Sequence, residues 1–218
     1  MTNDLRTQLR GLPVFAGELP GFDPDSAPDE PVVLFTDWLR TAIEGGVPEP
    51  HVMTLSTVDA EGRPSSRALI LKDVDGSGWQ FASTSAGRKG RELAANPYAA
   101  LSVYWQPLGR QVRVRGTVAS AGREASARDF LARSPGARAE SLAGRQSEPL
   151  TDLGELEEEV RRAARRLAAE PDLVPPSWTL YALQPDEVEF WQADAGRRHV
   201  RLRYTRSGAG WVRERLWP

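Results

Sequence analysis

Several short segments of this chain are rich in apolar residues, and in some of them hydrophobic and polar positions alternate, which predicts β-strands. The segments are HVMTLSTVD (51–59), SRALILKDVD (66–75), WQFAST (79–84), AALSVYW (99–105) and RQVRVRGTVAS (110–120). The turn residues AEGRP join the first two segments, which predicts a hairpin. From Trp178 onward the pattern is again that of strands.

Other segments have apolar residues at helical spacing. A helix over PVVLFTDWLRTAIE is predicted to begin after Asp29 or Glu30 and to stop at Gly45-Gly46. Its apolar residues near this spacing are Val33, Leu34, Trp38 and Ile43. Further helices are predicted over 87–97 and about 123–133, 137–146 and 152–169. The last of them carries a dense Glu/Arg face, which indicates a solvated helix.

The order of these elements predicts the fold class. Strands that follow one another without alternating crossover helices indicate a predominantly antiparallel sheet closed into a barrel, with helices packed on its outside. A doubly wound nucleotide-binding sheet is disfavoured, because no GxGxxG follows a strand. Residues 1–30 are punctuated by Pro and Gly and are expected to form an extended arm, while residues 31–218 form a single domain.

Composition narrows the function of this 218-residue chain. Its net charge of −2 argues against a general nucleic-acid binder. It has no cysteine and only two histidines, His51 and His199, so we expect no metal centre. No run approaches the ~18 apolar residues of a membrane span, and the N-terminus lacks a signal-peptide core, so we expect a cytoplasmic protein with no membrane partner.

The positive charge is local, and the C-terminal segment Glu189–Pro218 concentrates it. Its basic residues are Arg197, Arg198, His199, Arg201 and Arg203, expected together on one strand, with Trp191 nearby. Cations beside an indole ring suit a flat, anionic, aromatic ligand. The alternative interpretation is an amphipathic strand with a solvated basic edge.

Three upstream motifs could contribute to the same ligand site. In Arg67–Lys72 a strand carries a cation at each end, although solvated cations often flank strands. In Ser83–Gly90, hydroxyls, a glycine and two cations precede a helix, which makes a phosphate cradle plausible beside simple helix capping. Gln111 and Gln146 each offer a donor and an acceptor, as the edge of a flavin pyrimidine ring requires, but each alone could be an ordinary polar residue.

Taken together, these motifs are recognisable. SRALILK, FASTSAGRKGREL, GRQVRVRG, GRQS and EFWQ…RRHVRLRY…GWVRERLWP resemble, in this order and spacing, the pyridoxine/pyridoxamine 5'-phosphate oxidase family, from about residue 31 to the C-terminus. The resemblance implies an FMN-binding split β-barrel that forms a homodimer, with the flavin in a cleft between the subunits. It also implies oxidation of pyridoxine or pyridoxamine 5'-phosphate to pyridoxal 5'-phosphate, with O2 as electron acceptor and release of H2O2.

The resemblance assigns site residues position by position. The implied FMN contacts are Arg67, Ala68, Leu69, Ile70, Leu71, Lys72, Ala82, Ser83, Arg88, Lys89, Gln111, Gln146, Ser147, Trp191 and Arg201. The implied contacts to the small phosphorylated pyridine substrate are Lys72, Arg133, Arg197 and His199. Arg197 and His199 are the implied catalytic residues and are expected to project from one side of a strand. No residue is assigned to a metal.

The chain departs from the family pattern around Arg133, and this leaves alternatives open. The tyrosine and serine that usually flank this arginine are replaced by Asp129 and Ala137, and Asp129 is expected to repel a phosphate. One alternative is a phenazine-biosynthesis type of FMN oxidase acting on a dihydroaromatic acid, whose RQSE segment is matched by Arg145–Glu148. A second is a non-catalytic carrier of flavin or pyridoxal phosphate.

Overall fold

The structure is a computed structural model that describes residues 4–15 and 17–218. The chain divides into two compact units. The first unit comprises residues 1–50, 103–113 and 188–218, and the second comprises residues 51–102 and 114–187. Three strands, β4, β5 and β6, contribute residues to both units.

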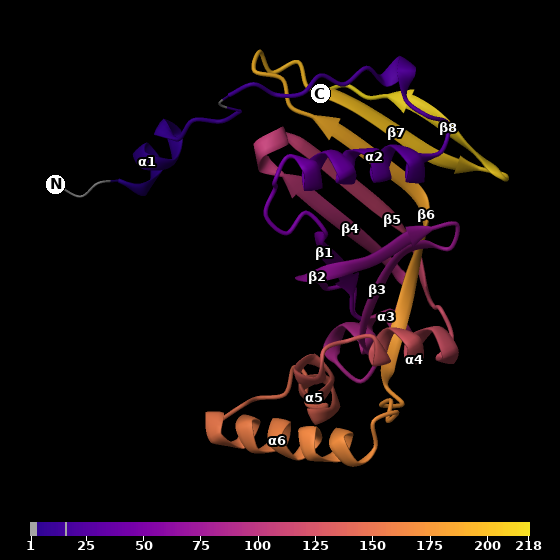
Figure 1. Cartoon of the computed structure of the whole chain (residues 1–218). Coiled ribbons are helices and arrows are strands. Elements are labelled where there is room, and N and C mark those ends of the chain that lie inside the picture. The colour runs from indigo at the N-terminus through magenta and orange to yellow at the C-terminus, as the bar shows by residue number, and fades with distance from the viewer. Residues whose placement is uncertain (1–3, 16) are drawn as a thin grey trace. The chain divides into compact units, whose positions relative to one another are not determined.

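Eight strands form one sheet in the order β3-β2-β1-β4-β5-β6-β7-β8 (Figure 1). They are β1 (Val52–Val58), β2 (Pro64–Asp75), β3 (Gly78–Thr84), β4 (Tyr98–Trp105), β5 (Arg110–Ser120), β6 (Trp178–Gln192), β7 (Val200–Ser207) and β8 (Gly210–Arg215). An additional antiparallel pairing, β3 with β6, joins the ends of the run from β3 to β6. These six strands therefore form a closed barrel, which confirms the predicted fold class, and β7 and β8 extend the sheet beyond it.

The first unit is built around α2 (Pro31–Glu44). Its buried face consists of Pro31, Leu34, Phe35, Trp38 and Ala42, at helical spacing. The rings of Trp38 and Phe190 pack edge to face with centroids 5.2 Å apart. The predicted helix is confirmed, and of the four residues at helical spacing Leu34 and Trp38 belong to this stripe, whereas Val33 and Ile43 lie outside it and are exposed.

The described part of the N-terminal segment contains two short helical elements. The short helix α1 (Leu5–Gly11) begins after Asp4, which caps the N–H of Arg6, and none of its residues is buried. The 3-10 turn η1 (Pro24–Ser26) follows. Tyr204 of β7 then donates its hydroxyl hydrogen to the Pro28 carbonyl at 2.7 Å, which fastens the end of the segment.

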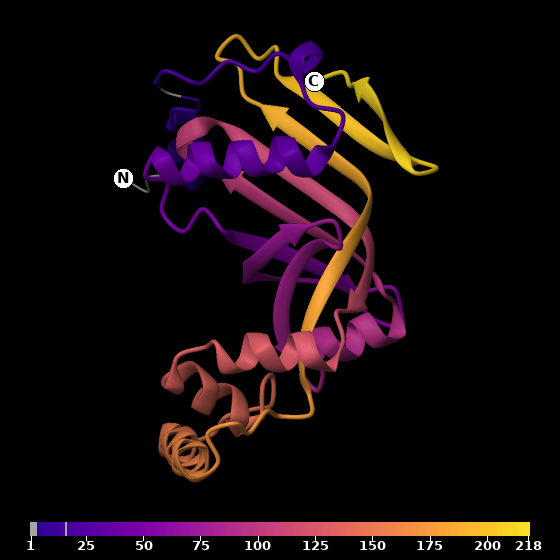
Figure 2. The same cartoon turned by 45° about the vertical axis from the view of Figure 1, so that its right-hand side comes forward.

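The second unit holds β1 to β3 and four helices: α3 (Arg88–Ala95), α4 (Arg123–Leu131), α5 (Pro135–Ala143) and α6 (Leu153–Ala169). All four agree with the sequence prediction to within a few residues. In both views α5 and α6 lie side by side (Figure 2). Their small core consists of Phe130, Ala139, Ala163, Leu167 and Trp178. The Glu/Arg face of α6 carries solvent-exposed ion pairs such as Arg161–Glu158 at 3.0 Å.

Candidate functional site

A pocket of about 500 Å³ lies in the second unit, beside the middle of β2, the C-terminal end of β3 and the connection from α5 to α6. Among its lining residues are nine of those predicted for cofactor or substrate: Ala68, Leu69, Ile70, Lys72, Ala82, Ser83, Lys89, Arg133 and Gln146. Segments far apart in the sequence thus converge on one cavity.

Four other predicted cofactor residues of this unit do not line the pocket. Arg67 and Arg88 lie in a polar cluster described below, Leu71 is buried, and Ser147 is exposed with a left-handed φ of 75°. The five remaining predicted residues, Gln111, Trp191, Arg197, His199 and Arg201, belong to the first unit.

Lys89 is the central cation of the pocket. It stands at the start of α3, and its Nζ donates to Ser83 Oγ at 2.8 Å and to Gln146 Oε1 at 2.6 Å. Burial lowers the pKa of Lys89, the positive charge of Arg67 lowers it further, and Glu92 opposes both. A partly desolvated ammonium that holds a buried hydroxyl and an amide is a strong site for an oxyanion.

The loop before α3 brings the backbone close to this lysine. A side chain at Gly90 would place its Cβ 2.3 Å from the Ser85 carbonyl oxygen, so only glycine permits this approach. Ser85 N also donates to the Ser177 carbonyl at 2.7 Å, which ties the end of β3 to the start of β6. The predicted cradle over Ser83–Gly90 thus has a rigid backbone.

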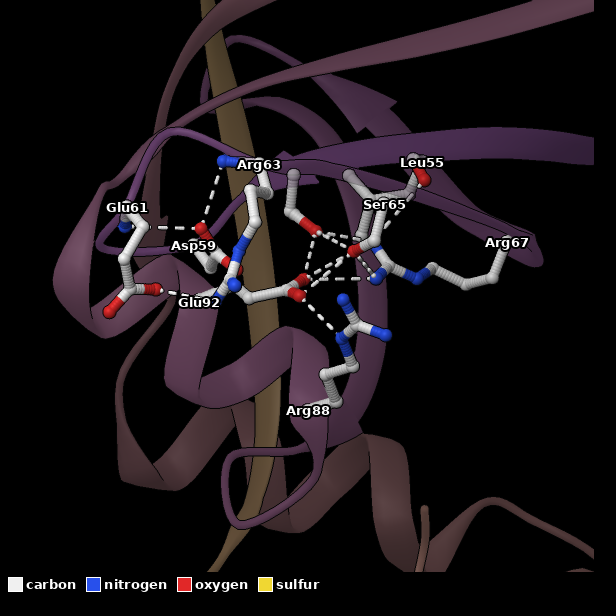
Figure 3. Close-up of polar contacts among 9 residues, drawn as sticks. Leu55, Asp59, Glu61, Arg63, Ser65, Arg67, Arg88 and Glu92 are labelled. Atoms are coloured by element: carbon white, nitrogen blue, oxygen red, sulfur yellow. Dashed lines mark hydrogen bonds and ion pairs between the residues drawn. The ribbon is translucent and has the colours of Figure 1, made fainter.

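Arg67 and Arg88 meet at the carboxylate of Glu92, which is 4% exposed (Figure 3). Glu92 Oε2 accepts from Arg67 at 3.0 Å, and Oε1 accepts from Arg88 Nε at 2.7 Å. Burial raises the pKa of Glu92, but hydrogen bonds from Thr57, Ser65 and the two arginines outweigh it and lower the value to about 2. Sequence reasoning missed Glu92, although its i,i+4 spacing from Arg88 was a usable signal.

A second charged cluster lies at Lys72, where the register between β2 and β3 shifts. Lys72 Nζ lies 3.3 Å from Asp129 Oδ1, and Trp178 Nε1 donates to Asp129 Oδ2 at 2.9 Å. Asp129, expected to repel a phosphate, is thus paired with a cation, because α4 brings this carboxylate against the lysine.

Arg133 stands over the ring of Trp178, with its Cζ 4.2 Å from the ring centroid, and it donates to Ser141. Burial lowers the pKa of Arg133, while Asp129 and Glu140 raise it. Ala137 contributes no polar side chain, and its N–H is capped by Ser134 at 3.3 Å. The structure thus places two predicted substrate cations, Lys72 and Arg133, in the pocket.

The prediction that Arg197 and His199 project from one strand is wrong. β7 begins at Val200, and both residues lie in the turn before it. Asp194 forms this turn: its carbonyl accepts from Arg197 N and its carboxylate from Arg198 N, both at 3.0 Å. Arg197 has a left-handed φ of 65°, so the alternation of a strand does not apply.

His199 lies in an aromatic cluster of the first unit. Its ring centroid is 4.8 Å from that of Trp191 and 5.2 Å from that of Phe15. Its Nδ1 accepts from Asp194 N at 3.1 Å, so the neutral ring carries its hydrogen on Nε2. Trp191, predicted to pack beside the flavin, is half-buried in this cluster.

Arg201 is held by a buried carboxylate. Its Nε donates to Glu189 Oε1 at 2.9 Å, and its NH1 donates to the Trp217 carbonyl at 2.8 Å. Burial raises the pKa of Glu189, but Arg201 and Arg113 outweigh it and leave the value below its usual range. Gln111 is half-buried at the start of β5 in the same unit.

In the part of the chain that the structure describes, no group of three His, Cys, Asp or Glu residues could hold a metal ion. No helix over residues 4–15 and 17–218 is long and apolar enough to cross a membrane.

A closed six-stranded antiparallel barrel, with a pocket lined in part by Lys72, Lys89 and Arg133, is the architecture of the FMN-binding split barrels. The family model for pyridoxamine 5'-phosphate oxidase matches residues 39–192. The model for the pyridoxine 5'-phosphate oxidase C-terminal dimerisation region matches residues 178–218. The chain therefore belongs to the pyridoxine/pyridoxamine 5'-phosphate oxidase family, and the second match supports a homodimer.

Individual relatives agree with this assignment. The pyridoxine/pyridoxamine 5'-phosphate oxidase of Rubrobacter xylanophilus is 41% identical over 198 residues, 91% of each chain. That of Burkholderia vietnamiensis is 43% identical over 197 residues, 89% of this chain and 91% of the relative. The crystal structure of PhzG from Burkholderia lata 383, in complex with tetrahydrophenazine-1-carboxylic acid, superposes with a TM-score of 0.86 at 34% identity, over 93% of this chain and all of PhzG.

The family consists of FMN-dependent oxidoreductases, and the pocket residues fit this cofactor. A phosphate monoester carries a charge of about −1.5 to −2 at pH 7 and accepts hydrogen bonds through three oxygens. Lys89 supplies a half-buried cation and Ser83 a hydroxyl in the pocket, and Arg67 and Arg88 lie on β2 and α3. The donor set of the second unit is thus chemically compatible with a phosphate monoester.

Proposed function

We propose that this protein is an FMN-dependent oxidase that converts pyridoxine 5'-phosphate or pyridoxamine 5'-phosphate to pyridoxal 5'-phosphate, with O2 as electron acceptor and H2O2 as product. The observation that carries the proposal is the pocket that unites Lys89, Ser83 and Gln146 with Lys72 and Arg133. The first three residues suit the phosphate of a cofactor, whereas Lys72 and Arg133 suit a second anionic ligand. The similarity to two oxidases of this name over about nine-tenths of the chain supports it.

In this proposal, Arg67, Arg88 and Lys89 hold the FMN phosphate, and Ser83 donates its hydroxyl to the same group. Further contacts to the cofactor come from the strand Arg67–Lys72 and from Ala82, Gln146 and Ser147. Gln111 and Arg201 engage heteroatoms of the flavin ring, and Trp191 packs beside it. We further propose that FMN is bound between the two subunits of the homodimer, and that residues 31–218 act as a single domain preceded by an arm.

Lys72, Arg133, Arg197 and His199 bind and orient the substrate. Bound FMN supplies a two-electron acceptor for the hydride of the substrate's 4' carbon, and O2 takes up these electrons to give H2O2. Because His199 Nδ1 already accepts from Asp194, its Nε2–H is the hydrogen it can donate to a substrate oxygen. Holding the reacting carbon in place is the main contribution expected of these side chains.

The test is aerobic turnover of each 5'-phosphate by the FMN-loaded protein, with aldehyde and peroxide measured together. We expect both products in equal amounts, and a loss of at least tenfold in kcat/KM for Arg197→Ala. Arg198→Ala is the matched control, because Arg198 is 89% exposed and its Nε lies 3.9 Å from Asp194. Turnover no faster than that of free FMN would refute the oxidase, and tight binding without peroxide would instead indicate a carrier.

A second candidate is an oxidase of dihydroaromatic acids, and the Lys72–Asp129 pair favours it. Asp129 offsets the charge of Lys72, so this end of the pocket suits a singly charged carboxylate better than a phosphate dianion. PhzG, which is similar over 93% of this chain, binds tetrahydrophenazine-1-carboxylic acid. Competition between pyridoxal 5'-phosphate and a tricyclic aromatic carboxylate for the loaded protein separates the two candidates.

A further inference from the structure

Glu92 is a buried carboxylate that does not line the pocket but bonds to two of the proposed phosphate ligands. Its carboxylate accepts from four side chains: Oε1 from Arg88, Oε2 from Arg67 and Thr57, and the single hydroxyl hydrogen of Ser65 lies within reach of both oxygens. The partners come from β1, β2 and α3 (Figure 3). A carboxylate with so many donors is held in one orientation and in its ionised form.

Two hydroxyls link Arg67 to this carboxylate. Thr57 and Ser65 stand opposite each other on β1 and β2. Arg67 NH2 donates to Ser65 Oγ at 2.5 Å and Arg67 NH1 donates to Thr57 Oγ1, while both hydroxyls donate onward to Glu92. Each hydroxyl therefore accepts from the guanidinium and donates to the carboxylate, an arrangement in which neighbouring bonds reinforce one another.

Arg88 is anchored differently. Glu92 takes only its Nε hydrogen, at 2.7 Å, and the side chain of Arg88 is 57% exposed. In Figure 3 a dashed line joins a single nitrogen of the Arg88 guanidinium to the carboxylate. Two terminal N–H groups presented in parallel are the geometry that binds a phosphate through two hydrogen bonds.

The charge of the cluster also matches a phosphate. Arg67, Arg88 and Lys89 are three cations, and Glu92 is the carboxylate bonded to the two arginines. The local charge is therefore about +2, which balances the phosphate dianion of a monoester. Without Glu92 the two guanidiniums would repel each other and lose their common anchor.

We propose that Glu92 is a positioning residue that preorganises Arg67 and Arg88 for the 5'-phosphate of FMN, so that the site selects phosphorylated flavin over riboflavin. This rests on the proposed function only in that Arg67 and Arg88 are taken as phosphate ligands. A carboxylate beside a phosphate would by itself weaken binding, so preorganisation has to outweigh that repulsion.

The experiment measures equilibrium binding of FMN and of riboflavin to the cofactor-free protein by quenching of flavin fluorescence. In the unchanged protein we expect FMN to bind at least tenfold more tightly than riboflavin. In Glu92→Gln we expect this ratio to fall about tenfold, with the riboflavin affinity unchanged. Because riboflavin occupies the same pocket, a general loss of structure would lower both affinities and leave the ratio unaltered.

The matched control is Glu61→Gln. Glu61 forms an ion pair with Arg63 at 2.8 Å on the same part of the fold, but its side chain is 64% exposed (Figure 3). We expect its FMN-to-riboflavin ratio to equal that of the unchanged protein. If Glu92→Gln does not fold, Ser65→Ala removes one hydroxyl of the cluster, and a smaller fall in the same ratio is expected.

The failures can be told apart. An unaltered or increased ratio in Glu92→Gln, or in Ser65→Ala where that variant is the one that folds, overturns the role of Glu92 alone. A ratio near one in the unchanged protein overturns this proposal and also the assignment of Arg67 and Arg88 as phosphate ligands. Oxidase activity with either 5'-phosphate enters none of these readouts.

Discussion

Two carboxylates of the second unit, Glu92 and Asp129, are each paired with cations, and their surroundings differ. Glu92 is 4% exposed, bonds to two arginines and leaves the cluster with a surplus of positive charge. Asp129 pairs with one lysine, Lys72, and so cancels the charge it meets. A carboxylate can therefore build an anion site or weaken one, and the number of cations it holds decides which.

The surroundings of the two carboxylates differ in the anion that they can bind. Around Glu92 the excess charge and the free guanidinium edge of Arg88 suit a phosphate dianion. Around Asp129 the cation that remains without a carboxylate at hydrogen-bond distance is Arg133, which stands over Trp178. The end of the pocket at Lys89 thus suits a phosphate dianion, while the end at Lys72 suits an anion of lower charge.

The largest expected effect concerns the contribution of the Glu92 carboxylate to the free energy of unfolding. The folded pKa of about 2 lies below the ordinary 4.5, so the ionised carboxylate stabilises the fold above pH 4.5, by about 3 kcal/mol. This contribution shrinks as the pH falls from 4.5 and is lost near pH 2. Glu92→Gln should lower the free energy of urea unfolding by about this amount at pH 7 and much less at pH 3. A difference in unfolding free energy between Glu92→Gln and the unchanged protein that is independent of pH would contradict this prediction.

The next effect concerns Lys89, the cation shared by Ser83 and Gln146. Lys89→Met keeps the length of the side chain and removes its charge and its donors. Loss of a charged hydrogen bond costs about 1.5–3 kcal/mol, so FMN should bind roughly 10- to 100-fold more weakly. Riboflavin titrated alongside serves as the reference ligand, and an equal loss for both flavins would place Lys89 away from the phosphate.

A smaller effect is expected when Asp129, the carboxylate paired with Lys72, is replaced. Asp129→Asn frees Lys72, so KM for pyridoxine 5'-phosphate should fall by roughly fivefold at low salt, and less at high salt, since partly exposed pairs are screened. Glu124→Gln, an exposed carboxylate on the same helix that pairs with Arg128, is the matched control. A higher KM in Asp129→Asn would show that Asp129 positions Lys72 and does not oppose the substrate.

The smallest expected effect distinguishes the contribution of the Trp178 ring from that of its indole N–H. Trp178→Phe removes the 2.9 Å hydrogen bond to Asp129 but keeps an aromatic face for Arg133. The free energy of unfolding should fall by about 1 kcal/mol, and KM should change by less than about twofold. A change in KM as large as that of Asp129→Asn would mean that the indole N–H, and not the lysine, holds Asp129 in place.

The sequence predicted the elements of this fold well, because alternation and helical spacing are local properties. β5 was predicted at 110–120 and lies at Arg110–Ser120. Closure through β3 and β6 follows from long-range pairing that local pattern only suggests. The strand expected through Arg197 and His199 failed for a local reason: the carbonyl and carboxylate of Asp194 both hold the backbone in a turn.

The sequence singled out individual residues of the candidate site but not the contacts between them. Lys89, Ser83 and Gln146 were each singled out, and the structure brings them together. Glu92 was missed because its i,i+4 spacing from Arg88 is also that of an ordinary surface ion pair on a helix. The pairing of Lys72 with Asp129 was missed because it joins β2 to α4, and the sequence alone does not show which helix covers which strand.

The pairing of β3 with β6 has a consequence for the order in which the protein can be made. It sets Trp79 opposite Leu183 and Thr84 opposite Trp178, so the wall of the pocket that contains Ser83 is completed by residues synthesised about a hundred positions later. A nascent chain that ends before β6 has Lys89 and Ser83 but no closed barrel around them. Flavin supplied during translation should therefore bind only after β6 has left the ribosome, so cofactor binding is expected late in the synthesis of each chain.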